Sequence, residues 1–223
     1  MRIRANDPIV ALDVDGVLGD FETHWADCAC EVLGRPMDKA NERHSLGVRY
    51  GLTSKEVDAV WRAFHGDGHD GRWGTMPLYD HAQDLVYALE DLGCQVWAVT
   101  SIDPRHEAAR AKSLAGLIPA KRVVCVGHAA PAGEKADVLY RLGAIAFLDD
   151  HPANANANAA RRGGEGGQVI GTKSDHTRVS QSNTAQLRQL QPAGLLTRPL
   201  NIRHGVAGGR VPKIAGDLVR HLA

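Results

Sequence analysis

Residues 9–25 read IVALDVDGVLGDFETHW, a stretch in which two aspartates follow an apolar run at once. The run is short and rich in β-branched residues, which is typical of a buried strand. Asp13 and Asp15 come where this strand should end, and Gly16 permits a turn that a residue with a Cβ atom would resist. In open α/β sheets, ligands bind beyond the carboxyl ends of the strands. The stretch therefore predicts a first strand that ends in a ligand site.

Short β-rich runs alternate with helix-like segments along the rest of the chain. This alternation predicts an α/β fold in which a parallel sheet is flanked by helices. The expected strands are residues 8–14, 95–100, 122–127, 144–148, 168–172 and 194–198.

The first two expected strands are separated by far more residues than a crossover connection needs, so an insertion should lie between them. In the middle of it, apolar residues recur at helical spacing from Val57 to Phe64, behind Thr53 and with Glu56 near the first turn. We therefore expect a small helical cap at residues 21–77, and a core formed by residues 1–20 and 78–223.

Further helices are expected in the core. One at 77–93 should end at Gly93, and another should begin near Lys135. A polar helix is expected from residue 154. A closing helix at 211–222 is indicated by its regularly spaced apolar residues.

Composition excludes some partners. The 223 residues contain 26 Lys+Arg and 26 Asp+Glu, so no overall charge attracts nucleic acid or an anionic membrane. The apolar runs are shorter than a membrane span, and the N-terminal MRIRANDP lacks the apolar stretch of a secretion signal. We expect a soluble cytoplasmic protein whose four cysteines are reduced.

Polar residues also end two later strands. Thr100 and Ser101 could donate hydrogen bonds to a phosphate, or they could cap the helix that follows. Asp149 and Asp150 form a second acidic pair, which could also cap a helix. Two acidic pairs at strand ends of one sheet favour a divalent cation, and Mg²⁺ prefers such oxygen ligands. Lys135 lies in the first turn of a helix, where a cation is unfavourable unless an anion is near. Taken alone, it would be an ordinary surface lysine.

The order of these elements, D-x-D-G, a strand-ending Thr/Ser, Lys and D-D, resembles the haloacid dehalogenase superfamily of phosphohydrolases over roughly residues 8–160. Within that superfamily, DVDGVLGDFE at 13–22 and FLDDHP at 147–152 are most similar to the 5'(3')-deoxyribonucleotidase family. In this likeness Trp61 falls on a tryptophan that lines the nucleotide pocket, and Asn201 falls at the end of the last strand. The resemblance implies a Rossmann-like sheet with a cap inserted after the first strand.

The resemblance also implies catalytic roles. Asp13 would be the nucleophile that forms an aspartyl-phosphate, and Asp15 would protonate the leaving oxygen and then activate water. Thr100 and Lys135 would hold the phosphate oxygens, with Ser101 beside them at the substrate.

The implied cofactor is Mg²⁺. Asp13 would bind it through its carboxylate and Asp15 through its main-chain carbonyl. Asp150 would be the remaining protein ligand, and Asp149 would order the water shell of the ion.

The sequence thus predicts a Mg²⁺-dependent phosphomonoesterase that acts on 5'-(deoxy)nucleoside monophosphates or a similar small phosphate ester. A phosphatase of nucleic-acid ends, like the phosphatase module of polynucleotide kinases, is an alternative, as is a non-catalytic binding protein on this fold. The second reading would need a local groove of Arg105, Arg110, Lys112, Arg161 and Arg162. Trp61 is either a nucleotide platform or part of the core of the cap, and Trp73 and His65 are further candidates beside it.

Overall fold

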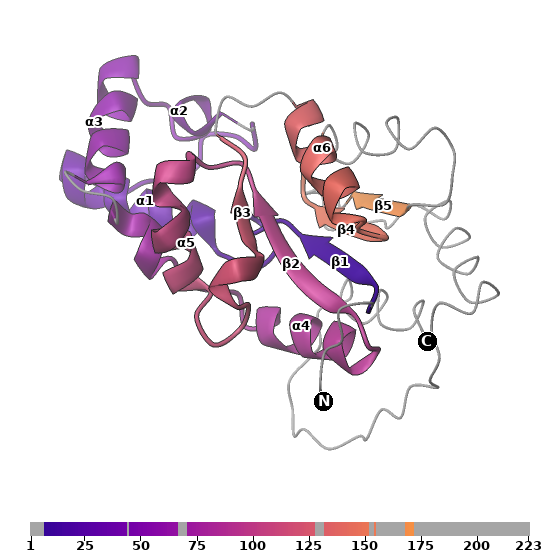
Figure 1. The fold of residues 1–223 in the computed structure, drawn as a ribbon. Helices are drawn as coiled ribbons and strands as arrows, with labels where there is room; N and C mark the ends of the chain where they lie inside the picture. The colour runs from indigo at the N-terminus through magenta and orange to yellow at the C-terminus, as the bar shows by residue number, and fades with distance from the viewer. Residues whose placement is uncertain are drawn as a thin grey trace.

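The computed structural model describes residues 7–43, 45–66, 71–127, 132–151, 154 and 168–171. Within these residues, parallel strands form one sheet in the order β3-β2-β1-β4-β5 (Figure 1). The strands are β1 (Ile9–Leu12), β2 (Gln95–Thr100), β3 (Val123–Cys125), β4 (Ala146–Asp149) and β5 (Gln168–Gly171). All five correspond to expected strands, so the predicted parallel α/β sheet is confirmed.

Strand β1 lies in the middle of the sheet, where Val10 is in register with Val96 of β2 and with Ala146 of β4. Successive residues of a strand face opposite sides of a sheet. Val10 and Leu12 accordingly contribute to one buried cluster and Ala11 to another. A strand covered on both faces must be apolar throughout, which is why IVAL has no polar alternation.

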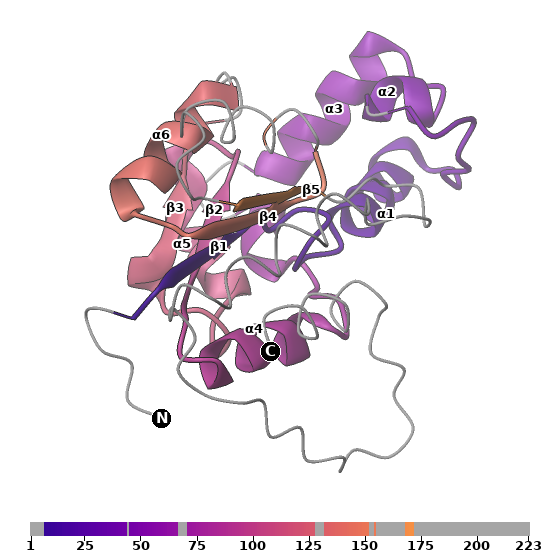
Figure 2. The ribbon, with the colours of Figure 1, turned by 90° about the vertical axis from the view of Figure 1, so that its right-hand side faces the viewer.

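Helices cover both faces of the sheet. Helix α4 (Ala82–Asp91) packs Leu85, Val86 and Leu89 into the cluster of Val10 and Leu12. Helix α6 (Ala132–Leu142) packs Leu139 against Ala11 on the other face. Figure 2 shows these two helices on opposite sides of the sheet. Helix α5 (Glu107–Ser113) follows β2 after the short 3-10 helix η2 (Pro104–His106), and the 3-10 helix η3 (Ala120–Arg122) precedes β3.

The inserted segment contains α1 (Phe21–Leu33), α2 (Leu46–Arg49), α3 (Ser54–His65) and the 3-10 helix η1 (Gly71–Thr75). Helices α1 and α3 share a buried cluster that includes Trp25, Val60 and Phe64. The predicted start of α3 is confirmed, because the hydroxyl of Thr53 accepts from the Glu56 amide while the Glu56 carboxylate accepts from Thr53. The division into core and cap at 21–77 stays a prediction.

Helix α4 begins five residues later than the sequence suggested. The backbone of Pro77 and Leu78 is used elsewhere: the Pro77 carbonyl accepts from the Asp20 amide, and Leu78 forms a bridge with Gly19. These contacts hold the segment extended beside the loop that follows β1, so the helix cannot begin there.

Several expectations lie outside the described residues: the polar helix beyond Asn154, the strand at 194–198 with Asn201, and the closing helix at 211–222. Cys28, Cys30, Cys94 and Cys125 are described and are all free, as expected. In the described part of the chain, no helix combines the length and apolar character needed to span a membrane.

Candidate active site

The carboxyl ends of β2, β1 and β4 bring predicted site residues to one edge of the sheet. Thr100 is the last residue of β2, Asp13 follows β1 directly, and Asp149 is the last residue of β4. The amide of Asp13 donates to the Leu148 carbonyl at 2.8 Å, which ties the end of β1 to β4. Parallel pairing thus places residues from distant parts of the chain next to one another.

Lys135 joins two of the carboxylates. Its Nζ lies 3.0 Å from Oδ2 of Asp13 and 2.7 Å from Oδ2 of Asp149. All three side chains are buried, so this lysine is not the ordinary surface residue that its sequence context alone suggested. The position of Lys135 in the first turn of α6 is balanced by the two anions that it contacts.

Burial sets the electrostatics of this group. It raises the pKa of Asp13 to about 8, an effect that Lys135 opposes and that Asp149 reinforces. Burial also lowers the pKa of Lys135, but Asp13 and Asp149 raise it by more, so the net shift is upward. Lys135 therefore remains an ammonium ion. Its single positive charge does not fully compensate the repulsion between the neighbouring carboxylates.

Asp149 is held in one orientation by several donors. Besides Lys135, its oxygens accept from the His151 amide at 2.7 Å and from Nδ2 of Asn154 at 3.0 and 3.3 Å. The bond to His151 is the kind that a capping aspartate makes, so the capping and site interpretations of Asp149 hold together. The sequence analysis missed Asn154, because asparagine is common in such turns and nothing marked this one.

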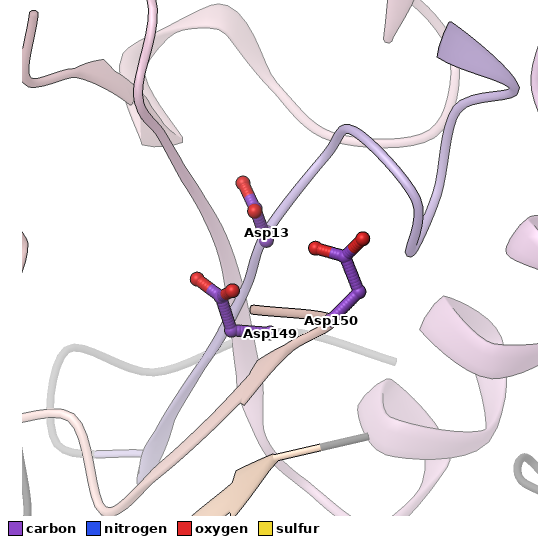
Figure 3. A group of neighbouring side chains, drawn as sticks. All are labelled: Asp13, Asp149 and Asp150. Atoms are coloured by element: carbon purple, nitrogen blue, oxygen red, sulfur yellow. The ribbon is translucent and has the colours of Figure 1, made fainter. Parts of the chain in front are cut away.

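Asp13, Asp149 and Asp150 form a carboxylate cluster, in which one oxygen from each residue lies within 4.8 Å of the others (Figure 3). Burial and the charge of Asp149 raise the pKa of Asp150 to about 6. Three carboxylates share the single positive charge of Lys135, and all the donors are hard oxygens. A divalent cation such as Mg²⁺ fits this donor set.

Gly16 leaves the room that Asp150 occupies. The glycine has φ +79°, and a Cβ atom placed on it would collide with Oδ2 of Asp150. A side chain at Gly16 would push this carboxylate out of the cluster. The glycine of the D-x-D-G motif is thus required both by the turn and by the position of Asp150.

If the carboxylate cluster binds Mg²⁺, Gly16→Ala should weaken that binding roughly tenfold, as loss of support for a metal-ligating group does. It should also destabilise the fold by about 1–2 kcal/mol, because alanine is strained at positive φ. Both effects are measured by titrating the protein with Mg²⁺ and recording its unfolding temperature and its rate of phosphate ester hydrolysis at each concentration.

Gly116→Ala is the matched control, because Gly116 has φ +85° with no atom within 4 Å of an added Cβ. It should cost similar stability and leave Mg²⁺ affinity unchanged. Equal affinity losses in the two variants would remove the link between Gly16 and Asp150.

Asp15 is directed away from the carboxylate cluster. Its Oδ1 accepts from Nη2 of Arg110 at 2.7 Å, and a quarter of its side chain is exposed. Asp13 and Asp15 therefore each face a cation of their own, Lys135 and Arg110. Two like charges are tolerated one residue apart because they point to different partners.

Thr100 lies inside the site, and its Oγ1 is buried with no hydrogen-bond partner among the described residues. A buried hydroxyl without a partner is unfavourable unless a ligand completes it. The capping alternative for Thr100 and Ser101 is wrong, because Asp103 caps the next helix by accepting from the Arg105 amide. Ser101 is half-buried just after β2.

The predicted aromatic candidates lie together in the inserted segment. Trp61 is half-buried, with its ring stacked near those of Phe21, His65 and Trp73 at centroid distances of 5.3–6.3 Å. Trp73 is buried and donates from Nε1 to Nδ1 of His65 at 3.2 Å. Trp73 is thus a packing residue, whereas Trp61 keeps some exposed surface.

One of the five residues expected to form a basic groove for nucleic-acid ends does not face solvent. Arg110 is fully buried, so it cannot bind a phosphate backbone. Arg105 is exposed, and Arg161 and Arg162 lie outside the described residues.

Comparison with known proteins gave matches among solved structures. One is a haloacid dehalogenase (HAD) family hydrolase from Deinococcus radiodurans, solved with bound phosphate and sodium, with 18% identity and a TM-score of 0.53; the match covers 88% of this chain and 100% of that one. A second is a haloacid dehalogenase-like hydrolase from Bacteroides fragilis, with 16% identity, a TM-score of 0.51, and coverage of 81% and 93%. The chain has the haloacid dehalogenase fold. No protein-family model and no curated protein matches the sequence.

These matches confirm the predicted superfamily fold. At this level of identity the likeness concerns the fold alone, so the likeness to 5'(3')-deoxyribonucleotidases and the roles of individual residues stay predictions. Within the haloacid dehalogenase fold of this chain, the largest difference from the sequence analysis concerns Arg110, which was placed in a basic groove but is buried. A lone arginine among alanines in a short helix gives no sign that it points inward.

Proposed function

We propose that this chain is a Mg²⁺-dependent phosphomonoesterase that acts through an aspartyl-phosphate on Asp13. The observation that carries the proposal is the Lys135 ammonium held between Asp13 and Asp149 at the carboxyl edge of the sheet. A carboxylate attacks a phosphate dianion poorly in water, and a fixed cation between them lowers the electrostatic barrier. The similar fold from Deinococcus radiodurans, which was solved with bound phosphate, supports the choice of substrate class.

In the first step, an oxygen of Asp13 attacks phosphorus as the bond from phosphorus to the ester oxygen breaks. Asp15 gives its proton to the departing oxygen, so that an alcohol leaves. In the second step, Asp15 takes a proton from water, which attacks phosphorus and releases inorganic phosphate and free Asp13. Lys135 and the unpaired hydroxyl of Thr100 would bind the non-bridging oxygens in both steps.

Asp13 and Asp150 would hold Mg²⁺ together with the main-chain carbonyl of Asp15, and Asp149 would orient its water shell. When bound, the ion would supply positive charge that compensates the negative charge of the three carboxylates. Asp15 as a proton donor favours a phosphate ester over a carbon-halogen bond, because halide needs no proton to leave.

We further propose a 5'-nucleoside monophosphate or a similar small ester as the substrate, and a cytoplasmic location. The choice of substrate rests on the likeness of DVDGVLGDFE and FLDDHP to the deoxyribonucleotidase motifs and on the partial exposure of Trp61. An aromatic face of this kind can stack on a base.

If Trp61 stacks on the base, Trp61→Ala should raise KM for a nucleotide by roughly tenfold, since a base–aromatic stack contributes about 1–3 kcal/mol. The rate with 4-nitrophenyl phosphate should change little. Tyr140→Ala, which truncates an exposed aromatic on α6, serves as the control. Equal losses on both substrates would mean that Trp61 is a packing residue.

The proposed function is tested by phosphate release from mononucleotides, sugar phosphates and 3'-phosphorylated oligonucleotides, each with Mg²⁺ and with chelator. We expect release from the small esters, which stops when Mg²⁺ is removed. Release from oligonucleotides alone would favour the nucleic-acid alternative. Halide release from a 2-haloacid would favour dehalogenation, and silence on every substrate would favour a binding protein.

A further inference from the structure

Arg110 is a fully buried cation whose carboxylate partner is Asp15. Its Nη2 donates to Oδ1 of Asp15 at 2.7 Å, and its side chain has no exposed surface. Withdrawing a guanidinium from water is costly, so a chain keeps one inside where its geometry is needed or its charge is compensated. Arg110 lies on α5 and reaches the loop that follows β1.

The guanidinium of Arg110 is held by its surroundings independently of Asp15. The ring of Trp73 lies 5.1 Å from its central carbon, and Nη1 lies 3.2 Å from the sulfur of Met76. Met76 is itself buried, and its methyl group packs against Gly19, where an added Cβ atom would collide with it. Residues of η1 and of the chain just after it therefore set the direction in which Arg110 points.

The loop that carries Asp15 is closed tightly. The amides of Leu18 and Gly19 donate to the Val14 carbonyl at 2.9 and 2.7 Å, and the Gly16 amide donates to the Gly19 carbonyl at 3.1 Å. These bonds fix the backbone of the turn but leave the rotamer of the Asp15 side chain undetermined. The fixed guanidinium of Arg110 selects one of them.

The two oxygens of Asp15 are consequently different. Oδ1 accepts from Arg110, whereas Oδ2 takes no part in that contact, and a quarter of the side chain is exposed. A carboxyl group that is clamped at one oxygen presents the other in a defined direction. General acid catalysis depends on such positioning as much as on acidity.

We propose that Arg110 is a positioning residue that aims Oδ2 of Asp15 at the ester oxygen of the substrate. The inference rests on the proposed phosphomonoesterase function and adds a residue to it. Arg110 touches neither phosphate nor the leaving group. It acts through Asp15, whose proton moves to the ester oxygen as the bond to phosphorus breaks.

The test compares two esters that differ in their need for a proton donor. Ethyl phosphate releases a basic alkoxide that must be protonated, whereas 4-nitrophenyl phosphate releases a stable phenolate. In Arg110→Met, kcat/KM for ethyl phosphate should fall roughly 10²–10⁴-fold, the range of general acid catalysis, and kcat/KM for 4-nitrophenyl phosphate should fall less than about tenfold. This ratio kcat/KM reports the step that forms the aspartyl-phosphate.

Asp15→Asn should show the same selective loss, and the double variant Asp15→Asn/Arg110→Met should lose no more than Asp15→Asn alone. The double variant removes both charges of the pair, so it leaves neither charge of the pair without its partner. If Arg110→Met does not fold, Arg110→Gln, which keeps a donor, is compared on the two esters instead. Arg141→Met on α6 is the control, because Arg141 is exposed and lies in no part of the proposed site.

Equal losses on the two esters in the folded Arg110 variant would overturn the inference and leave Arg110 as a packing residue, with the phosphomonoesterase function untouched. Additive losses in the double variant would overturn it as well. If the wild-type protein hydrolyses neither ester, the proposed function fails, and the role of Arg110 falls with it.

Discussion

Replacing Asp13 by asparagine is expected to reduce phosphate release by roughly 10⁴-fold or more, the scale seen when a nucleophile is removed. The amide is nearly the same size as the carboxylate but cannot attack phosphorus. The fold should survive, because Lys135 keeps its 2.7 Å contact with Asp149. The unfolding temperature should therefore stay within roughly 4 °C of wild type, which corresponds to about 1 kcal/mol.

The measurement is steady-state hydrolysis of 4-nitrophenyl phosphate, with thermal unfolding of the same sample. Asp58→Asn on α3 is the matched control, because Asp58 is exposed and the substitution is identical. The control should keep its rate. A residual rate above a tenth of wild type in Asp13→Asn would mean that another group is the nucleophile.

Replacing Lys135 by methionine should lower the free energy of unfolding by roughly 3–5 kcal/mol, as expected when one partner of a buried ion pair is removed. Asp13 and Asp149 would remain buried with their shared cation gone. The loss should shrink when Mg²⁺ is added, since a divalent cation can replace the missing charge. Activity should fall as well, because the phosphate loses a cationic ligand.

Urea unfolding with and without Mg²⁺ measures this effect. Lys121→Met removes a lysine from η3 that is exposed, and it should change stability by less than about 0.5 kcal/mol. A loss below about 1 kcal/mol in Lys135→Met would show that the two carboxylates do not depend on this ammonium.

The strands of this chain could be predicted because each is a short apolar run between turn residues. Such runs leave few alternatives when both faces of the sheet are covered. The start of α4 could not be predicted, because it depends on the contacts of Pro77 and Leu78 with the loop after β1. The sequence around residue 77 does not indicate that it contacts a segment more than fifty residues away in the chain.

The site shows the same division. Asp13 and Asp149 could be found because they end strands, and parallel topology brings strand ends to one edge. Thr100 was ambiguous until Asp103 proved to be the cap. Arg110 could not be assigned, because the direction of a side chain on a short helix depends on how that helix packs.

The order of the strands also bears on how the chain is made. Strand β1 is synthesised first but lies in the centre of the sheet, and its second edge stays open until β4 has left the ribosome. During that interval an apolar segment with free backbone groups is exposed to aggregation. Charged residues beside an apolar strand discourage such pairing in general, and Asp13 and Asp15 follow β1 at this position.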